Sequence, residues 1–279
     1  MASPSPAFIP ELSEPRQAAP APLSRPRPLD LSMLAGILVA LAATAAGIAF
    51  TGVRLNYFLQ PVGVLIVVGG TLGVTLITTP RRALVHSLQR VAGLLRPRTT
   101  DRAALIDEII SFSKLARRKT ILGIETEIGQ SNHAFLRDAL TLAIDARTRD
   151  ELRATLEMKL RLRERQGDAD AKALEVAGGF APTIGVLGTV VGLIDVLRQF
   201  SNLSSVAYGI GTAFVSTIYG LALANLVLLP AANRIRASVA DVFETDEMIV
   251  EGALGVLDGM HPALLSERLS CFLRESPNR

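Results

Sequence analysis

Cysteine, histidine and tryptophan are scarce in this chain, and so is charge. Cys271 is the one cysteine among 279 residues, so no intrachain disulfide can form and a disulfide-stapled secreted domain is excluded. His86, His133 and His261 lie far apart, and no spacing of a metal site or a Ser–His–Asp triad is present. We therefore expect no enzyme, no catalytic residue, no metal and no bound cofactor. Charged residues make up 20% of the chain, below the roughly 25% of a typical soluble protein.

Four stretches contain no Asp, Glu, Lys or Arg. They have 23, 26, 19 and 35 residues and cover Leu31–Val53, Leu55–Pro80, Val176–Ile194 and Gln199–Asn233. About 20 helical residues cross a hydrocarbon core of about 30 Å, so each stretch is long enough to span a membrane. A buried helix of a soluble protein explains one such stretch but not four. The sequence predicts an all-α polytopic membrane protein with four transmembrane helices and a helical cytoplasmic insert.

The basic residues predict the topology, because Lys and Arg stay on the cytoplasmic side of a membrane. The linker between the first two stretches carries one charge, Arg54, whereas residues 81–175 carry 19 basic and 14 acidic residues. We therefore place both termini in the cytoplasm. The predicted regions are a disordered Pro-rich leader (1–30), two spans (31–80), the insert (81–175), two more spans (176–233) and C-terminal helices (234–279).

Apolar residues in the cytoplasmic regions recur with a helical period. This pattern predicts helices over Ala103–Leu115, Ala134–Ile144, Asp150–Ala173, Arg234–Leu257 and Ala263–Leu273. We expect the helix Asp150–Ala173 to continue into the third span. Gly259 and Pro262 should separate the last two helices. The charged faces suit either a solvated surface or a docking surface for a partner, and periodicity does not distinguish the two.

The last two spans contain small and hydroxyl-bearing residues. Gly188 and Gly192 are four apart, as are Ser216 and Gly220, which allows close helix packing in a membrane. Gly185 with Gly188 and Gly209 with Gly211 do not form phosphate loops, because no Lys follows either pair as in a Walker motif. No carboxylate lies at mid-depth, since Asp195 falls at the outer end of the third span. If these spans conduct a cation, the ion-carrying carboxylate should come from another subunit.

Each of these two spans has a proline near its cytoplasmic end. Pro182 and Pro230 each remove a helical hydrogen bond and permit a bend. Both residues can act as hinges, and a plain helix boundary at Pro230 is an equally good interpretation.

Several motifs resemble the MotA/TolQ/ExbB ion-channel superfamily. Residues 179–194 (GFAPTIGVLGTVVGLI) and 209–225 (GIGTAFVSTIYGLALAN) resemble its third and fourth spans. More specifically, the chain resembles the MotA/PomA branch of this superfamily, the A subunits of the flagellar stator. Val68–Gly73 with Thr79–Pro80 resembles their second span. Leu115–Glu125 resembles their rotor-facing motif, and Gly259–Leu273 resembles their C-terminal motif.

The resemblance implies a subunit that couples ion flow across the inner membrane to torque on the flagellar rotor. It implies five copies around a dimer of single-span B subunits, whose aspartate carries H⁺ or Na⁺, and a rotor switch protein as a further partner. Thr189 and Thr217 would line the ion path, Pro182 and Pro230 would couple protonation to movement, and Arg117 and Glu125 would contact the rotor.

Two other functions remain open at this point. An ExbB/TolQ-like energiser of outer-membrane transport resembles the chain in its last two spans, but such proteins usually have three spans and only one before the insert. A membrane scaffold without ion conduction is the second alternative. Nucleic acid is not an expected partner.

Overall fold

The computed structural model describes residues 31–50, 52, 58–94, 100–119, 121–198 and 203–274, which form helices and turns without a strand. The proposed leader, residues 1–30, lies outside this set. The first and last helices are α1 (Leu31–Phe50) and α11 (Pro262–Arg274). Between them lie α2 (Pro61–Val64), η2 (Leu65–Gly69), α3 (Gly70–Thr78), α4 (Arg81–Leu94), α5 (Arg102–Lys119), η3 (Ile121–Ile124), α6 (Glu125–Ile128), α7 (Ala134–Asp145), α8 (Arg149–Arg198), α9 (Leu203–Ala222), η4 (Leu223–Leu228) and α10 (Leu229–Leu257).

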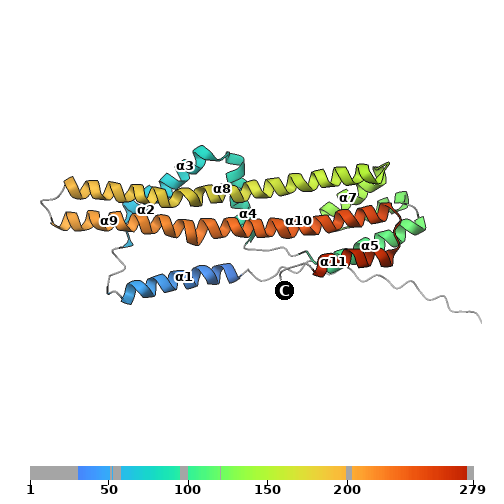
Figure 1. The fold of residues 1–279 in the computed structure, drawn as a ribbon, viewed down its shortest axis with the longest axis horizontal. Coiled ribbons are helices and arrows are strands. Elements are labelled where there is room, and N and C mark those ends of the chain that lie inside the picture. The colour runs from blue at the N-terminus through green and yellow to red at the C-terminus, as the bar shows by residue number, and fades with distance from the viewer. Residues whose placement is uncertain are drawn as a thin grey trace, which may run out of the picture.

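Two long antiparallel helical rods form the axis of the molecule (Figure 1). One rod is α8, which has 50 residues and is therefore about 75 Å long. The other is the succession α9, η4 and α10, which runs without a break from Leu203 to Leu257. Each rod has an apolar part and a charged part, so the predicted continuation of the insert helix into the third span is confirmed.

Small residues bring α8 and α9 into close contact. A Cβ atom built on Gly220 would lie 2.5 Å from the carbonyl oxygen of Ala181, and one on Gly192 would lie 2.8 Å from the backbone nitrogen of Ala213. Gly188 meets the side chain of Ser216 in the same way, at 2.7 Å. The two helices thus pack backbone to backbone, as the four-residue spacings predict.

The second apolar stretch packs against this pair. It forms one helix, Pro61–Thr78, through α2, η2 and α3, where η2 is a π-helical segment. Gly63 lies against Ser216, and Gly70 lies against Ile184. In Figure 1, α1 lies along the opposite side of the rods. Its side chains Leu38, Val39 and Leu41 are exposed, which suits contact with lipid.

In the described part of the chain, three helices are long and apolar enough to cross a membrane: Pro61–Thr78, Arg149–Arg198 and Val206–Leu257. A shorter apolar segment, Leu38–Phe50, belongs to α1. That α1 also spans the membrane, the orientation of the chain and the exact boundaries of the regions remain predictions.

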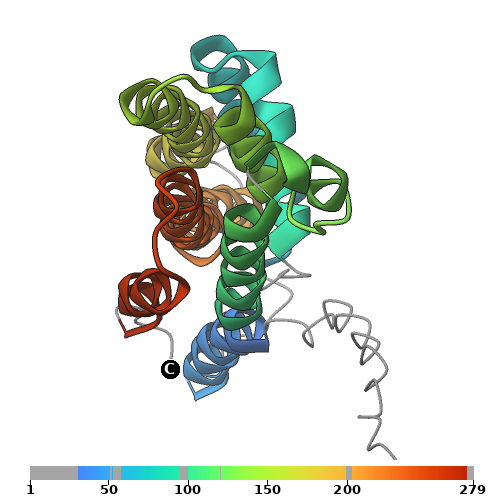
Figure 2. The same ribbon diagram turned by 90° about the vertical axis from the view of Figure 1, so that its right-hand side faces the viewer.

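A second core lies at the charged end of the rods, where α5, α7 and α11 surround the ends of α8 and α10 (Figure 2). Its fully buried side chains include Ile109, Phe135, Leu156, Leu254 and Leu265. The predicted break between the last two helices is also present, because Gly259 adopts a φ of 63°, a left-handed conformation that favours glycine. The predicted helices of the insert and tail are all found here, within longer ones.

Helix α4 was not among the predicted elements. It follows the second span directly and crosses the long rods, with contacts to both α8 and α10 (Figure 1).

Candidate functional site in the paired spans

The hydroxyl groups of Thr189 and Thr217 lie against one another between α8 and α9. Their oxygen atoms are 2.5 Å apart. The Thr189 hydroxyl also reaches the carbonyl oxygen of Ala213 at 3.0 Å and that of Gly185, in its own helix, at 3.3 Å. With its proton directed at a carbonyl, Thr189 accepts a hydrogen bond from Thr217. A threonine bonded only within its own helix would not make these contacts across the helix pair.

A second polar cluster joins α9 to the start of the second apolar helix. Gln60, at the start of the second span, is only 6% exposed, and its side-chain oxygen accepts a hydrogen bond of 3.0 Å from the Thr212 hydroxyl. The Tyr219 hydroxyl donates to the carbonyl of Phe58 and accepts from the backbone N–H of Gln60 at 3.3 Å. These bonds fix the start of α2 to α9. The sequence analysis missed Gln60, although an amide directly before an apolar helix is a usable signal.

The two prolines lie inside helices rather than at their ends. Pro182 lies within α8, which continues on both sides of it. Pro230 is the second residue of α10, directly after η4 and Leu229, and the N–H of Leu229 bonds to the carbonyl of Ala224, five residues earlier. This wider π-helical turn lets the chain continue past a residue that cannot donate a hydrogen bond. Pro230 thus lies where the π-helical segment changes to α-helix, and the chain is helical on both sides of it.

Ion pairs join the helices on the charged side of the prolines. Asp170 of α8 is 2% exposed, and its carboxylate accepts a bond of 2.6 Å from Nε of Arg90 in α4. Glu175 of α8 pairs with Arg236 of α10 and, at 3.3 Å, with Lys172. These pairs hold α4, α8 and α10 together about two to three helical turns from Pro182.

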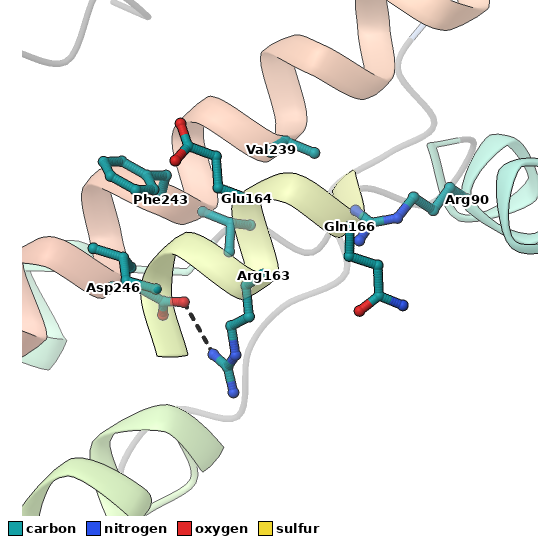
Figure 3. A pocket seen from close by; sticks show the side chains of 9 residues that line it. Arg90, Arg163, Glu164, Gln166, Val239, Phe243 and Asp246 are labelled. Atoms are coloured by element: carbon teal, nitrogen blue, oxygen red, sulfur yellow. Dashed lines mark hydrogen bonds and ion pairs between the residues drawn. The ribbon is translucent and has the colours of Figure 1, made fainter. Parts of the chain in front are cut away.

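A hollow of about 230 Å³ opens between α4, α8 and α10. Figure 3 shows Arg163 and Asp246 pointing towards one another at its wall, where their ion pair measures 3.0 Å. Asp246 is 2% exposed, and burial raises the pKa of its carboxyl group although Arg163 opposes this shift. The same guanidinium lies 4.4 Å from the centre of the Phe135 ring. The carboxylate of Asp246 and the guanidinium of Arg163 thus bind one another at the wall of the hollow.

Arg117 and Glu125 are both exposed at the bundle on the charged end of the rods. Arg117 lies in the last turn of α5, and Glu125 begins α6 after the short η3. The turn between them is held by the buried side chain of Ile124 and by a 3.1 Å ion pair between Lys119 and Glu127. Both residues therefore face solvent on a braced turn, far along the rods from the threonine pair.

Comparison with known families matches nearly the whole chain. Residues 34–120 match the model of the motility protein A N-terminal region, and residues 127–248 match the MotA/TolQ/ExbB proton channel family. Motility protein A of Bacillus subtilis is 30% identical over 250 residues, which cover 88% of this chain and 91% of that protein. Chemotaxis protein PomA of Vibrio alginolyticus is 24% identical over 247 residues, which cover 88% of this chain and 96% of that protein.

Solved structures show the same fold. The flagellar MotAB stator complex of Bacillus subtilis includes a chain that superposes with a TM-score of 0.78 at 28% identity, covering 86% of this chain and 94% of that one. A chain of the C. jejuni MotAB structure superposes with a TM-score of 0.82 at 24% identity, and the match covers 89% of this chain and 98% of that one. The match of residues 34–120 is to the motility branch and not to the ExbB/TolQ branch. The chain belongs to the motility protein A family of flagellar stator subunits, which act in ion-driven torque generation.

Proposed function

We propose that this chain is the ion-conducting A subunit of a flagellar stator and works only with a single-span B subunit. In this proposal five copies form a ring around two B subunits, each of which supplies an aspartate that carries the cation. The chain crosses the inner membrane four times with both termini in the cytoplasm. The MotAB complexes of Bacillus subtilis and C. jejuni support the pairing of A and B subunits.

The observation that carries the proposal is the hydroxyl pair of Thr189 and Thr217 between two apolar helices. Hydroxyl oxygens can bind a passing cation or its water, but they cannot carry a proton alone. The stretches Val176–Ile194 and Gln199–Asn233 contain no carboxylate that could do so. The geometry thus suits one side of an ion path whose charged group belongs to a partner.

Pro182 and Pro230 are proposed to convert protonation of that partner into movement. Both lie on the charged side of the threonine pair, and each leaves a helical carbonyl without its usual partner. A bend there would move the charged parts of α8 and α10 together, because Glu175 joins the two helices through Arg236. Arg117 and Glu125, exposed on the braced turn, are proposed to meet the charged surface of the rotor switch protein.

Replacement of Thr217 by valine tests the ion path, because it removes one hydroxyl and nearly preserves the shape. We expect cation flux through the reconstituted A–B complex to fall about tenfold, since a lost hydrogen bond costs about 1–1.5 kcal/mol. Thr217→Ser keeps the hydroxyl and should retain most of the flux. Thr44→Val is a matched control in α1, where the Thr44 hydroxyl bonds only to its own helix, to Ala40.

Normal flux in Thr217→Val, with equal protein in the membrane, would show that this hydroxyl is not part of the path. The A subunit reconstituted alone should conduct little, because the carboxylate is then missing. Full conduction without the B subunit would refute the shared site.

A further inference from the structure

Helix α4 lies just outside the uncharged stretches, because Arg81 follows Pro80 directly and α4 contacts α8 at Asp170. Its Ser87 hydroxyl donates to the backbone carbonyl of Asp170 at 2.6 Å, and Arg90 pairs with the Asp170 carboxylate. Asp170 precedes Val176, the start of the uncharged stretch, by six residues or about 9 Å. Headgroups occupy about 5–8 Å on each side of the hydrocarbon core. Since α4 crosses the rods here (Figure 1), its length runs along the membrane surface.

Twelve of the fourteen residues of α4 divide into three faces by helical spacing. The inward face packs on the rods and contains Ala83, Leu84, Ser87 and Val91. One outer flank has apolar residues after its first arginine and contains Arg81, Val85, Leu88 and Ala92. The other flank is polar and contains Arg82, His86, Gln89 and Gly93. Val85 is 53% exposed and Leu88 is 65% exposed, so the apolar flank is not covered within this chain.

The charge of this region is entirely basic. Residues 55–100 contain five arginines and neither Asp nor Glu. The neighbouring acids of α8 are already paired, Asp170 with Arg90 and Glu175 with Lys172 and Arg236. Arg81 and Arg82, by contrast, form no ion pair within the described part of the chain. Two adjacent guanidinium groups are thus left at the level where phosphate groups lie, and guanidinium binds phosphate oxygens in a forked geometry.

We propose that α4 binds anionic phospholipids of the cytoplasmic leaflet. Arg81 and Arg82 bind the headgroup phosphates, while Val85 and Leu88 insert beside the first acyl carbons, as in amphipathic helices that lie in an interface. The bound lipid holds α4, and α4 holds α8 through Asp170, on the charged side of Pro182. This site is separate from the ion path and does not depend on it.

The absence of tryptophan from the sequence allows a direct test. Leu88→Trp places a fluorophore on the apolar flank, and Gln89→Trp places a matched one on the polar flank. The full chain is reconstituted into vesicles whose acyl chains carry bromine, a short-range quencher. We expect stronger quenching for Leu88→Trp than for Gln89→Trp, and stronger quenching of Leu88→Trp by brominated phosphatidylglycerol than by brominated phosphatidylcholine at the same mole fraction.

The arginines are tested in the Leu88→Trp background. Each of Arg81→Gln and Arg82→Gln should reduce the preference for phosphatidylglycerol by up to about fivefold. Lys114→Gln, an exposed change in α5, should leave it unchanged, and circular dichroism should report the same helix content in all variants. Equal quenching by the two lipids in the protein with both arginines would overturn the proposal. So would Leu88→Trp emission that neither lipid quenches, which would mean that a second copy covers this face.

Discussion

At the scale of single residues, two helical glycines differ in the space around them. Gly220 lies where α9 touches α8, and an added Cβ would meet the carbonyl oxygen of Ala181 and the Cα atom of Gly185. Backbone atoms cannot move aside as the end of a side chain can. Gly73, in α3, is also helical, but an added Cβ would meet nothing within 4 Å. The two positions therefore form a matched pair for testing the helix contact.

We predict that Gly220→Ala destabilises the protein by about 1–3 kcal/mol, the usual cost of overpacking. Gly73→Ala should be neutral or slightly stabilising, because alanine favours a helix. Thermal unfolding of the purified protein in detergent, followed by circular dichroism, measures both. Equal melting temperatures for the two variants would contradict the backbone-to-backbone packing of α8 and α9.

His133 should make the cytoplasmic bundle sensitive to acid. Its Nδ1 atom accepts the N–H of Leu136 at 3.4 Å and so caps α7, which requires an unprotonated Nδ1. Burial lowers the pKa of His133, although the carboxylates of Asp246 and Glu108 oppose this shift. The unfolded chain therefore takes up a proton at a higher pH than the folded chain. Stability from this group is present above the ordinary pKa of about 6.5 and is lost as the pH falls below it.

The predicted result is a lower unfolding temperature at pH 5.5 than at pH 7.5, and a smaller difference in His133→Asn. Asparagine also caps helices well, so the variant should fold. Burial raises the pKa of Asp246, which works in the opposite direction, because its folded form then gains stability on acidification. Comparing the two proteins over the same pH range isolates His133. An identical pH dependence in both would rule out its role.

At the scale of elements, the sequence predicted helices whose inward faces are large and apolar. The series Ile106, Ile109 and Phe112 marks α5, and all three side chains are buried in the bundle core. Helix α4 is also clearly amphipathic, so a helical pattern for it was present in the sequence and was overlooked. The π-helical segments have no signature in hydropathy, because they depend on backbone hydrogen bonds and not on side-chain polarity.

The candidate site was predictable to a different extent. Thr189 and Thr217 could be paired through the family resemblance, and the structure places their hydroxyls in contact. The buried arginine Arg102 could not be found, because in a charge-rich segment it looks like one more solvated residue. In the folded protein it bonds to Asp241 at 2.8 Å, Glu244 at 3.0 Å and Thr245 at 3.1 Å. Such contacts join residues about 140 positions apart, which no local pattern records.

The π-helical turn before Pro230 gives an element-scale prediction. Pro230→Ala restores a backbone donor, so the turn can change to a regular α-helix that bends less easily. We expect torque, measured from the rotation of tethered cells, to fall several-fold while the amount of protein in the membrane stays the same. Pro262→Ala is the control, because Pro262 starts α11 and lies at the first position of a helix, where proline costs nothing. Unchanged torque in Pro230→Ala would exclude a hinge there.

At the scale of the whole molecule, the rods connect the threonine pair to the bundle at the charged end. Thr189 and Leu156 lie on one unbroken helix, 33 residues or about 50 Å apart. Leu156 belongs to the bundle core. Arg102 ties the start of α5 to α10 and, through the carbonyl of Phe272 at 3.3 Å, to α11. If the prolines act as the proposed hinges, the bundle should move as one body, and with it the turn that carries Arg117 and Glu125.

This arrangement predicts that the rotor-facing charges and the ion path can be separated by mutation. Arg117→Glu should reduce torque several-fold while cation flux through the A–B complex stays normal, because Arg117 lies in the last turn of α5, outside the spans. Lys114→Glu, one helical turn earlier and also exposed, is the matched control and should have a small effect. If the contact is electrostatic, reversing an acidic residue on the rotor switch protein should restore part of the torque, and raising the ionic strength should weaken both the defect and its rescue. Loss of ion flux in Arg117→Glu, or a torque defect that no rotor charge compensates, would instead assign this turn to the assembly of the stator.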